Sequence, residues 1–357
     1  LVLLVESGGA NVMDYQVEVW SMAGGEFAGL AELSAMGFPI VTVLHGMSVA
    51  GGAYNIGMSD YVIGVKDNGM AALAGSNLLR AATGEETSDK DLGGVEVHSK
   101  TTGLVEYLAE DDCHAIEIAR RVVKSLDWNR REDRHNAKEF KVPRYSTDEI
   151  LGLVPTDFRK PYDVKELICR LVDDSDFVEF KPDYGVSTVC VHANIFGISC
   201  ALIGNNGPID PNGAAKATHF FQLCDQVNRP IIFLHNTTGY MVGAQYEHAG
   251  MIKHGSKMIQ AVANIKVPKI ALYIGASFGA GNYGMCGFSY KPDFLLTWPN
   301  AQTGVMGGQQ AAKTMEHVMR NAAKRKGKEI DEKAFSKQIS DIETHFDNQS
   351  DAFITSG

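Results

Sequence analysis

Two glycine-rich stretches decide the fold of this chain: Ala50-Gly51-Gly52-Ala53-Tyr54 and Gly279-Ala280-Gly281-Asn282-Tyr283. Their tyrosines, at positions 54 and 283, differ by 229 residues. At that offset the flanking residues align as well: Pro39 with Pro268, Gly46 with Gly275, and Glu6-Ser7-Gly8-Gly9 with His235-Asn236-Thr237-Thr238. Self-similarity at a fixed offset is the signature of a repeated structural unit. The sequence therefore predicts an α/β chain built from two copies of one strand–turn–helix unit.

Each turn has the composition of an oxyanion hole. An apolar run precedes both turns, Val41–Leu44 in the first copy and Ile270–Tyr273 in the second, and small residues that can open a helix follow. Glycine lets the backbone approach a ligand closely, and a helix N-terminus adds unpaired N–H donors and partial positive charge. Such donors stabilise negative charge on a carbonyl oxygen. Tight packing without chemistry is the alternative for a single short motif, and the duplication favours function.

Neither turn carries an acid or a base. Gly52 is followed by Ala53-Tyr54-Asn55, and Gly281 by Asn282-Tyr283. A hydratase or an isomerase needs a general acid–base group that reaches the substrate. Two oxyanion holes without one indicate a reaction in which a second substrate carries the proton.

Longer motifs extend the evidence across most of the chain. Those of the first half resemble the β (carboxyltransferase) subunits of biotin-dependent acyl-CoA carboxylases: Ser7–Asn11, Ala50–Tyr54, Ala81–Glu85, Asp91–Gly94 and His98. Those of the second half resemble the C-terminal half of the same subunits: Thr238–Gly243, Lys253–Lys257, Ser277–Cys286, Trp298–Asn300 and Val305–Gly308. The resemblance runs from Leu1 to about Ala312.

The resemblance implies two tandem crotonase-like (ClpP/crotonase) domains. Residues 1–126 would form the acyl-CoA side, 127–161 a linker, and 162–357 the biotin side. Family members assemble, commonly as hexamers, so that the first domain of one subunit faces the second domain of another. Biotin would arrive on a partner, the α subunit that contains the biotin carboxylase and biotin carrier, because this chain has no Met-Lys-Met biotinylation site.

The resemblance also assigns roles to individual residues. Gly51 and Gly52 would offer amides to the thioester oxygen as it becomes an enolate, and Ala280 and Gly281 would do the same for the ureido oxygen of biotin. In the family mechanism the biotin nitrogen takes the proton from the acyl group, which agrees with the absence of a side-chain base. Further residues would line the ligand sites: Gly279 and Asn282 would bind the cofactor at the second turn, Phe278 and Tyr283 would line the acyl or the biotin pocket, and Thr83 and Gly84 would form a wall of the CoA site.

The motif at the second turn indicates the acyl group. Ser277–Cys286 resembles the 3-methylcrotonoyl-CoA and geranyl-CoA branch of the family, whereas Gly207–Gly213 and His235–Gly239 look more like the geranyl-CoA type. We therefore expect transfer of a carboxyl group from carboxybiotin to a β-methyl-branched enoyl-CoA. Two alternatives stay open at this point: a biotin-linked decarboxylase subunit of the same superfamily, and a noncatalytic paralogue that scaffolds assembly.

Composition limits the other possibilities. The net charge of −10 argues against nonspecific nucleic-acid binding, which needs a basic face. The six cysteines are scattered, without a C-x-x-C pair, so we expect neither a metal site nor a disulfide framework. Apolar runs stay short of the roughly 20 residues that cross a bilayer. We expect a cytoplasmic or mitochondrial-matrix protein, with no targeting segment visible. The chain also departs from the family at both ends, as a fragment of a longer subunit would.

Periodicity predicts the remaining elements. Asp112–Leu126 has the spacing of a helix that buries Ile116, Ala119, Val123 and Leu126. Strands are expected at 188–193, 198–203, 231–234 and 269–273, helices at 213–227 and 247–262, and a charged helical tail at 313–345. His235, His248, His254 and His317 lack the spacing of metal ligands and are interpreted as ordinary polar positions. Lys216, Lys253 and Lys257 would either contact CoA phosphates or form surface ion pairs.

Overall fold

A computed structural model describes residues 1–8, 17–126, 139–327 and 329–355, with side chains from residue 25 onward in the second of these ranges. Residues 9–11 of the Ser7–Asn11 motif and residues 127–138 of the expected linker lie outside the described residues.

The first half of the chain forms a parallel sheet. Its strands follow the order β1 (Val2–Ser7), β2 (Val41–Val49), β3 (Tyr61–Val65) and β5 (Tyr107–Ala109), and β4 (Met70–Ala72) pairs with the end of β2. The connecting helices are α1 (Val17–Ala35), α2 (Gly51–Gly57), α3 (Ser76–Thr83), α4 (Asp89–Gly93), α5 (Val95–Val97), a short π-helix (His98–Thr102) and α6 (Asp112–Leu126). Strands alternating with helices are typical of parallel sheets, since each crossover needs a connection of a dozen or more residues.

The second half forms a larger, mixed sheet. Its order is β11 (Phe294–Thr297), β10 (Lys269–Phe278), β9 (Ile231–Thr237), β8 (Ile198–Asn205), β7 (Thr188–Ile195) and β6 (Phe177–Phe180), with β12 (Gln302–Gly304) beside the end of β10. The helices are α7 (Ile150–Leu153), α8 (Val164–Cys169), α9 (Pro211–Gln226), α10 (Ala244–His248), α11 (Met251–Asn264), α12 (Gly279–Gly284), α13 (Gly308–Arg325), α14 (Glu332–Ser350) and α15 (Ala352–Thr355). Short 3-10 helices occupy Thr147–Glu149, Asp173–Ser175 and Phe288–Tyr290.

The strand register confirms the repeat. β2 and β10 are equivalent, because each pairs in parallel with three strands, β1, β3 and β4 in the first sheet and β9, β11 and β12 in the second. Each also has the same irregularity. Between β1 and β2 the pairing stops at Val5–Leu44 and resumes at Ser7–Ser48. Between β9 and β10 it stops at His235–Tyr273 and resumes at Thr237–Ser277. A shared bulge at equivalent positions is a built feature of both units.

The register corrects one detail of the alignment. The constant offset of the sequence placed Glu6 opposite His235. In the sheets, however, Val5 pairs with Leu44 and His235 pairs with Tyr273, and Leu44 and Tyr273 are equivalent residues of the repeat. The first strand of the repeat is therefore displaced by one residue relative to the turn, since the connections between the two strands differ in length.

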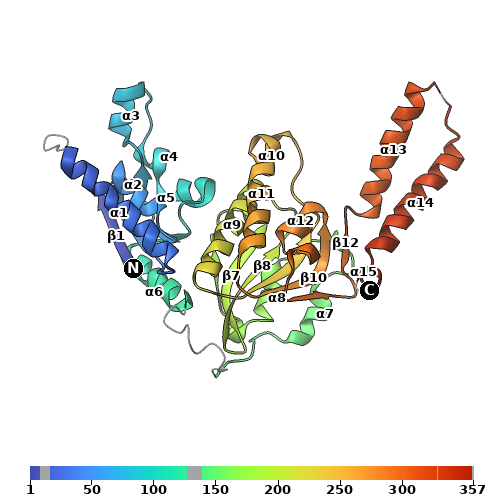
Figure 1. The fold of residues 1–357 in the computed structure, drawn as a ribbon, viewed down its shortest axis with the longest axis horizontal. Coiled ribbons are helices and arrows are strands. Elements are labelled where there is room, and N and C mark those ends of the chain that lie inside the picture. The colour runs from blue at the N-terminus through green and yellow to red at the C-terminus, as the bar shows by residue number, and fades with distance from the viewer. Residues whose placement is uncertain (9–16, 127–138, 328, 356–357) are drawn as a thin grey trace.

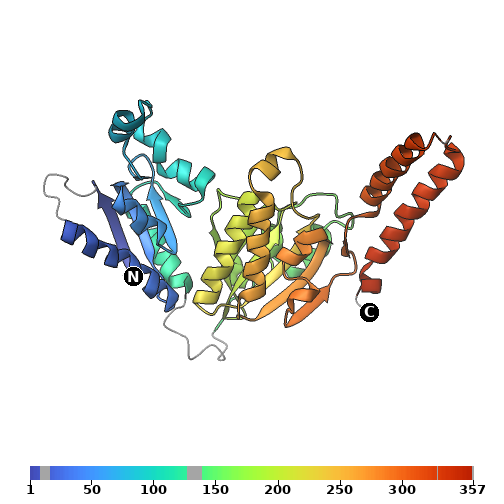
Figure 2. The same ribbon diagram turned by 45° about the horizontal axis from the view of Figure 1, so that its top comes forward.

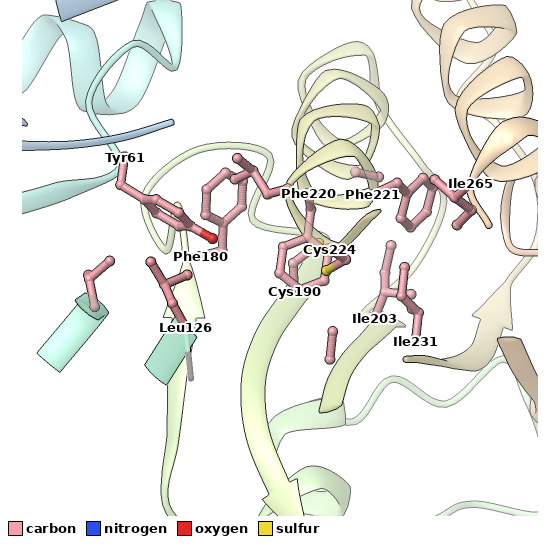
Figure 3. Close-up of a cluster of buried hydrophobic side chains, with 14 of the residues drawn as sticks. Tyr61, Leu126, Phe180, Cys190, Ile203, Phe220, Phe221, Cys224, Ile231 and Ile265 are labelled. Atoms are coloured by element: carbon pink, nitrogen blue, oxygen red, sulfur yellow. The ribbon is translucent and has the colours of Figure 1, made fainter. Parts of the chain in front are cut away.

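One hydrophobic core joins the two sheets. Tyr61 of β3 packs edge-on against Phe180 of β6 at 6.0 Å, and Leu126 at the end of α6 belongs to the same buried cluster. Figure 3 shows these side chains leading into the layer between α9 and the second sheet, where Cys190 lies close to Phe220 and Cys224. A separate cluster packs α8 against the opposite face of the second sheet.

Buried polar contacts reinforce the junction. Lys181 Nζ lies 3.0 Å from Glu106 Oε1, with side-chain exposures of 7% and 2%. Gln226 Nε2 donates to Asp60 Oδ2 at 3.1 Å, and the Tyr61 hydroxyl lies 3.2 Å from His192 Nε2. The two halves are thus held as one body by apolar packing and by charges withdrawn from water.

Three expected elements differ from the structure in detail. The expected helix at 247–262 is broken into α10 and α11, because Gly250 adopts a left-handed conformation with φ +80°. Helix α6 buries Ala115, Ala119, Val122 and Leu126 rather than the predicted Ile116 and Val123 positions, a rotation of one residue. The expected helical tail at 313–345 is divided into α13 and α14, because Gly327 follows the first of them in a left-handed conformation with φ +61°.

The C-terminal helices form a hairpin. α13 and α14 pack against each other beyond β12, on the side of the second sheet remote from the first (Figures 1 and 2). Over the described ranges, no helix combines the length and the apolar character that crossing a membrane requires.

Candidate active site

The first turn joins β2 to α2. Ala50 takes a conformation rare for a non-glycine residue, with φ 55° and ψ −123°, and its N–H donates to the Ala72 carbonyl at 3.1 Å. Gly51 and Gly52 then begin α2, so their N–H groups have no intrahelical acceptor. Strained backbone of this kind persists where the surroundings hold it. The result is a pair of amides presented at the C-terminal end of a buried strand.

Gly52 has no room for a side chain. A Cβ built there lies 2.7 Å from Ser48 Oγ and 2.8 Å from Ser7 Cβ. The helix therefore begins in direct contact with β1 and β2, and glycine is required by this close approach. By contrast, a Cβ at Gly57, the last residue of α2, meets nothing within 4 Å.

The second turn has the same construction. Phe278 ends β10, Gly279 has a positive φ of 56° at the position equivalent to Ala50, and Ala280 and Gly281 continue the first turn of α12. A Cβ at Gly281 would lie 2.8 Å from the Gly239 backbone and 3.1 Å from Thr237 Cγ2. Ala280 is exposed and Gly281 is buried. Both turns thus present helix N-terminal amides, and both are packed so closely on the residues beneath them that no side chain fits at Gly52 or Gly281.

A polar network supports the second turn. Asn282 Nδ2 donates to Ser277 Oγ and to the Tyr273 hydroxyl, both at 2.8 Å, and His235 Nδ1 lies 2.8 Å from the same Ser277 oxygen. His235 is fully buried, and burial lowers its pKa to about 3, so the ring is neutral. The structure adds that the His235 ring is enclosed and hydrogen-bonded, and the interpretation of His235 as an ordinary polar position without metal or acid–base work stays a prediction.

The first copy replaces this network with apolar residues. Val5, Leu44 and Ala53 stand where the second copy has His235, Tyr273 and Asn282. Ser48, the equivalent of Ser277, is retained, and its buried Oγ has no hydrogen-bond partner among the residues that the structure describes. The two turns share a backbone but differ in what lies beneath them, as expected if they receive different ligands.

A cavity of about 460 Å³ adjoins the second turn. Phe278 and Thr238 contribute to one side, and the N-terminus of α13 at Gly307 and Gly308 contributes to another. Phe158 packs edge-on against Phe278 at 5.5 Å and gives the cavity an apolar wall. Most of the other lining residues are polar or charged, among them Asp157, Arg159 and Glu343.

Comparison with known proteins identifies the family. The carboxyl transferase domain model matches residues 1–353. The chain belongs to the carboxyl transferase domain family. A probable biotin-dependent acyl-coenzyme A carboxylase beta2 subunit from Mycobacterium tuberculosis is 44% identical over all of this chain and 67% of its own length. The mitochondrial methylcrotonoyl-CoA carboxylase beta chain of Dictyostelium discoideum is 43% identical over 95% of this chain and 58% of its own length.

Solved structures agree on family and fold. The beta subunit of geranyl-CoA carboxylase from P. aeruginosa is 48% identical with a TM-score of 0.57, over 99% of this chain and 65% of that one. The transcarboxylase 12S hexamer is 27% identical with a TM-score of 0.84, over 99% of this chain and 67% of that one. The crotonase-like α/β fold expected from the sequence is confirmed. The chain spans about two thirds of the length of these carboxyl transferase proteins.

In this carboxyl transferase chain the two turns are far apart. α2 lies on the first sheet and α12 beyond the middle of the second, and both views separate them (Figures 1 and 2). One protomer therefore does not bring its own two pairs of amides to one reacting centre.

The structure places the remaining predicted ligand residues at varying distances from the turns. Thr83 and Gly84 end α3, while the start of that helix, at Gly75, is the part beside Val49 of β2. Eight helical residues separate these ends by about 12 Å, so the CoA-wall role of Thr83 and Gly84 stays a prediction. Tyr283 is half exposed on α12.

Two side chains near these sites were missed or misplaced by sequence reasoning. Lys216 is neither a surface residue nor a phosphate ligand, because it lies on the buried face of α9 and is completely enclosed. Glu26 of α1 brings a carboxylate close to the first glycine-rich turn, because its Oε1 accepts a hydrogen bond from Asn55 Nδ2 of α2 at 2.9 Å. No signal in the sequence links Glu26 to Asn55, since the contact depends on how α1 packs. Among the described residues, no cluster of His, Cys, Asp and Glu has the geometry of a metal site.

Proposed function

We propose that this chain is the carboxyltransferase component of a biotin-dependent acyl-CoA carboxylase, which moves the carboxyl group from carboxybiotin to a branched enoyl-CoA, 3-methylcrotonoyl-CoA or geranyl-CoA. The observation that carries this proposal is the duplicated turn: two strand–turn–helix units in one register, each presenting helix N-terminal amides. Family membership and the names of the similar proteins support the reaction class.

The first turn is assigned to the acyl-CoA. Gly51 and Gly52 donate their N–H groups to the thioester oxygen, where negative charge develops as the enolate forms. Because these amides are fixed by Ala50 and by the contact of Gly52 with Ser7 and Ser48, they need no reorganisation during the reaction. The domain of residues 1–126 is accordingly proposed as the acyl-CoA side.

The second turn is assigned to biotin, within residues 162–357. Its residues fit the group: Ala280 and Gly281 offer amides to an uncharged acceptor oxygen, and the neighbouring ionisable ring of His235 is neutral. Phe278, Gly279, Asn282 and Tyr283 surround this point on β10 and α12. When bound, carboxylated biotin supplies the carboxyl group and accepts the proton. Donation to the ureido oxygen by the two amides stabilises the charge that develops there.

The complete site requires a second copy of the chain. Since the two turns of one protomer are far apart (Figure 1), the first turn of one copy faces the second turn of another. The transcarboxylase 12S structure is a hexamer assembly, and we propose the same order of assembly here. The biotin would be delivered by an α subunit that contains the biotin carboxylase and biotin carrier.

Substrate-selective turnover tests the proposal. The chain is combined with its biotin-carrying subunit, ATP and bicarbonate, and initial rates are compared for 3-methylcrotonoyl-CoA, geranyl-CoA and propionyl-CoA. We expect selective carboxylation of a branched enoyl-CoA. Exclusive use of propionyl-CoA would overturn the acyl assignment, and absence of any transfer despite CoA binding in an intact oligomer would overturn the reaction.

A further inference from the structure

A row of buried polar side chains crosses the second sheet below helix α9. Thr188 of β7 pairs with Asn205 of β8, and β8 continues beside β9, where Gly204 pairs with Leu234, so the next residues, Asn205 and His235, are neighbours. His235 in turn pairs with Tyr273 of β10. Because side chains alternate along each strand, these residues share the face that carries Ile203 and Phe233 toward α9.

Lys216 lies over one end of this row. A Cβ at Gly213 would lie 2.5 Å from Thr188 Oγ1, which places the first turn of α9 directly on Thr188. Lys216 follows three residues later on the buried side of this helix, which packs on the cluster that contains Cys190, two residues along β7 from Thr188. Figure 3 shows Cys190 on the strand beneath this helix.

These side chains hold polar atoms without protein partners. Lys216, Thr188 and Asn205 are each 0% exposed. Within the described part of the chain, Lys216 Nζ, Thr188 Oγ1 and both amide atoms of Asn205 have no hydrogen-bond partner. A buried polar atom that pairs with nothing destabilises a fold, and adjacent unpaired groups in proteins are usually satisfied by internal water. Together these three side chains offer hydrogen-bond donors and an acceptor but no carboxylate, and water, which both donates and accepts, can pair with all of them.

The other end of the row reaches the second turn. His235 contacts Ser277 Oγ, and Asn282 of α12 donates to the same oxygen. Asn282 lies next to Gly281, whose amide we assign to biotin. The row therefore extends from Lys216 to the helix that bears the second pair of amides.

We propose that Lys216, Thr188, Asn205 and His235 enclose an internal water-binding site that positions the second turn. The positioning role, though not the water site itself, rests on the proposed function. Lys216 acts as a positioning residue: water joins its amine to Asn205 and His235, and the Ser277–Asn282 contacts carry this constraint to α12. The first copy lacks the polar residues that connect this row to the turn, since Val5 and Ala53 replace His235 and Asn282, so the device is specific to the second turn.

A crystal structure of the full chain tests the water site directly. We expect ordered water within about 3.2 Å of Lys216 Nζ and of the Asn205 amide. Lys216→Met, which keeps the length of the side chain, and Thr188→Val, which keeps its shape, should each remove water from the row. A dry row in the wild-type structure, or an anion on Lys216, would overturn the proposal.

Kinetics tests the positioning role. In the assembled enzyme we expect Lys216→Met to lower kcat about tenfold, with KM for the acyl-CoA unchanged within about twofold, because the first turn is untouched. Lys337→Met, on the exposed face of α14, is the matched control and should retain wild-type rates. Water present with an unaltered kcat in both Lys216→Met and Thr188→Val would refute positioning. Wild-type enzyme without carboxyl transfer, but with the waters present, would refute the proposed function and leave the water site standing.

Discussion

Gly52→Ala is the substitution that most sharply separates a working first turn from a passive one. The variant keeps the backbone N–H but adds a Cβ that would lie 2.8 Å from Ser7 Cβ and 2.7 Å from Ser48 Oγ. The Ser48 hydroxyl can rotate, whereas Ser7 Cβ is fixed to the backbone of β1. The start of α2 must therefore move by about 0.6 Å to reach an ordinary contact of 3.4 Å.

The size of the expected effect follows from that movement. A displacement of about 1 Å of a positioned group costs about 10²-fold in rate, and loss of one oxyanion donor costs about 10²- to 10³-fold. A shift of about 0.6 Å should thus reduce carboxyl transfer by about 10- to 100-fold. Thermal unfolding should still be cooperative, since the strain is confined to one end of a short helix.

The assay compares Gly52→Ala with a control from the same helix. Gly57→Ala adds the same methyl group where nothing lies within 4 Å, and it should retain the wild-type rate of carboxyl transfer. Initial rates with 3-methylcrotonoyl-CoA and geranyl-CoA are measured for both variants in the assembled enzyme. Equal rates for the two variants would refute the reasoning that the amides of the first turn stabilise the reacting oxygen.

Three further predictions concern ionisable side chains. Lys181→Met leaves Glu106 as an unpaired buried carboxylate and should lower the free energy of unfolding by about 3–5 kcal/mol, whereas Lys66→Met, at an exposed pair, should leave the midpoint of urea denaturation nearly unchanged. His235 has a pKa of about 3 in the folded chain against 6.5 for the free side chain, so the unfolded chain takes up the proton first as the pH drops. The free energy of unfolding therefore falls between about pH 6.5 and pH 3, by up to about 1.4 kcal/mol per pH unit. The slope of the free energy of unfolding against pH should be smaller in His235→Asn, and an unchanged slope would contradict a buried, neutral His235. Glu26→Gln should keep carboxyl transfer, because the proton passes to the second substrate, and a loss comparable to that of Gly52→Ala would instead make Glu26 the base.

The repeated unit was readable from the sequence because its glycines serve the backbone. Gly52 and Gly281 each begin a helix against a neighbouring strand, and Gly46 and Gly275 each face the side chain of the adjacent strand, Glu6 or Asn236. No other residue fits these places, so the spacing of the turns survives in the sequence. The alternation of apolar runs likewise predicted the strands that lead into each turn.

The support beneath the turns was not readable in the same way. His235, Tyr273 and Asn282 come together through strand register and a bulge, and neither leaves a periodic signal. The burial of Lys216 was missed for a related reason: a lysine is almost always exposed, and only the packing of α9 on β7 encloses it. A comparison of the two copies would have pointed to this network, since Val5 and Ala53 stand at the equivalent positions of the first.

The shared core between the sheets also escaped sequence reasoning. Tyr61 and Phe180 contact each other across 119 residues of sequence, and their apolar character predicts burial without naming a partner. The rotation of α6 by one residue has the same origin, because its buried face is set by contact with both sheets.

The central claim is that the first turn binds the thioester oxygen through the amides of Gly51 and Gly52. A crystal structure of the assembled enzyme with 3-methylcrotonoyl-CoA or geranyl-CoA tests it most directly. The account predicts the thioester oxygen about 2.7–3.1 Å from both nitrogens, with the second turn of a neighbouring copy facing the acyl group. A thioester bound away from Gly51 and Gly52, in an enzyme that turns over in the same crystals, would contradict it.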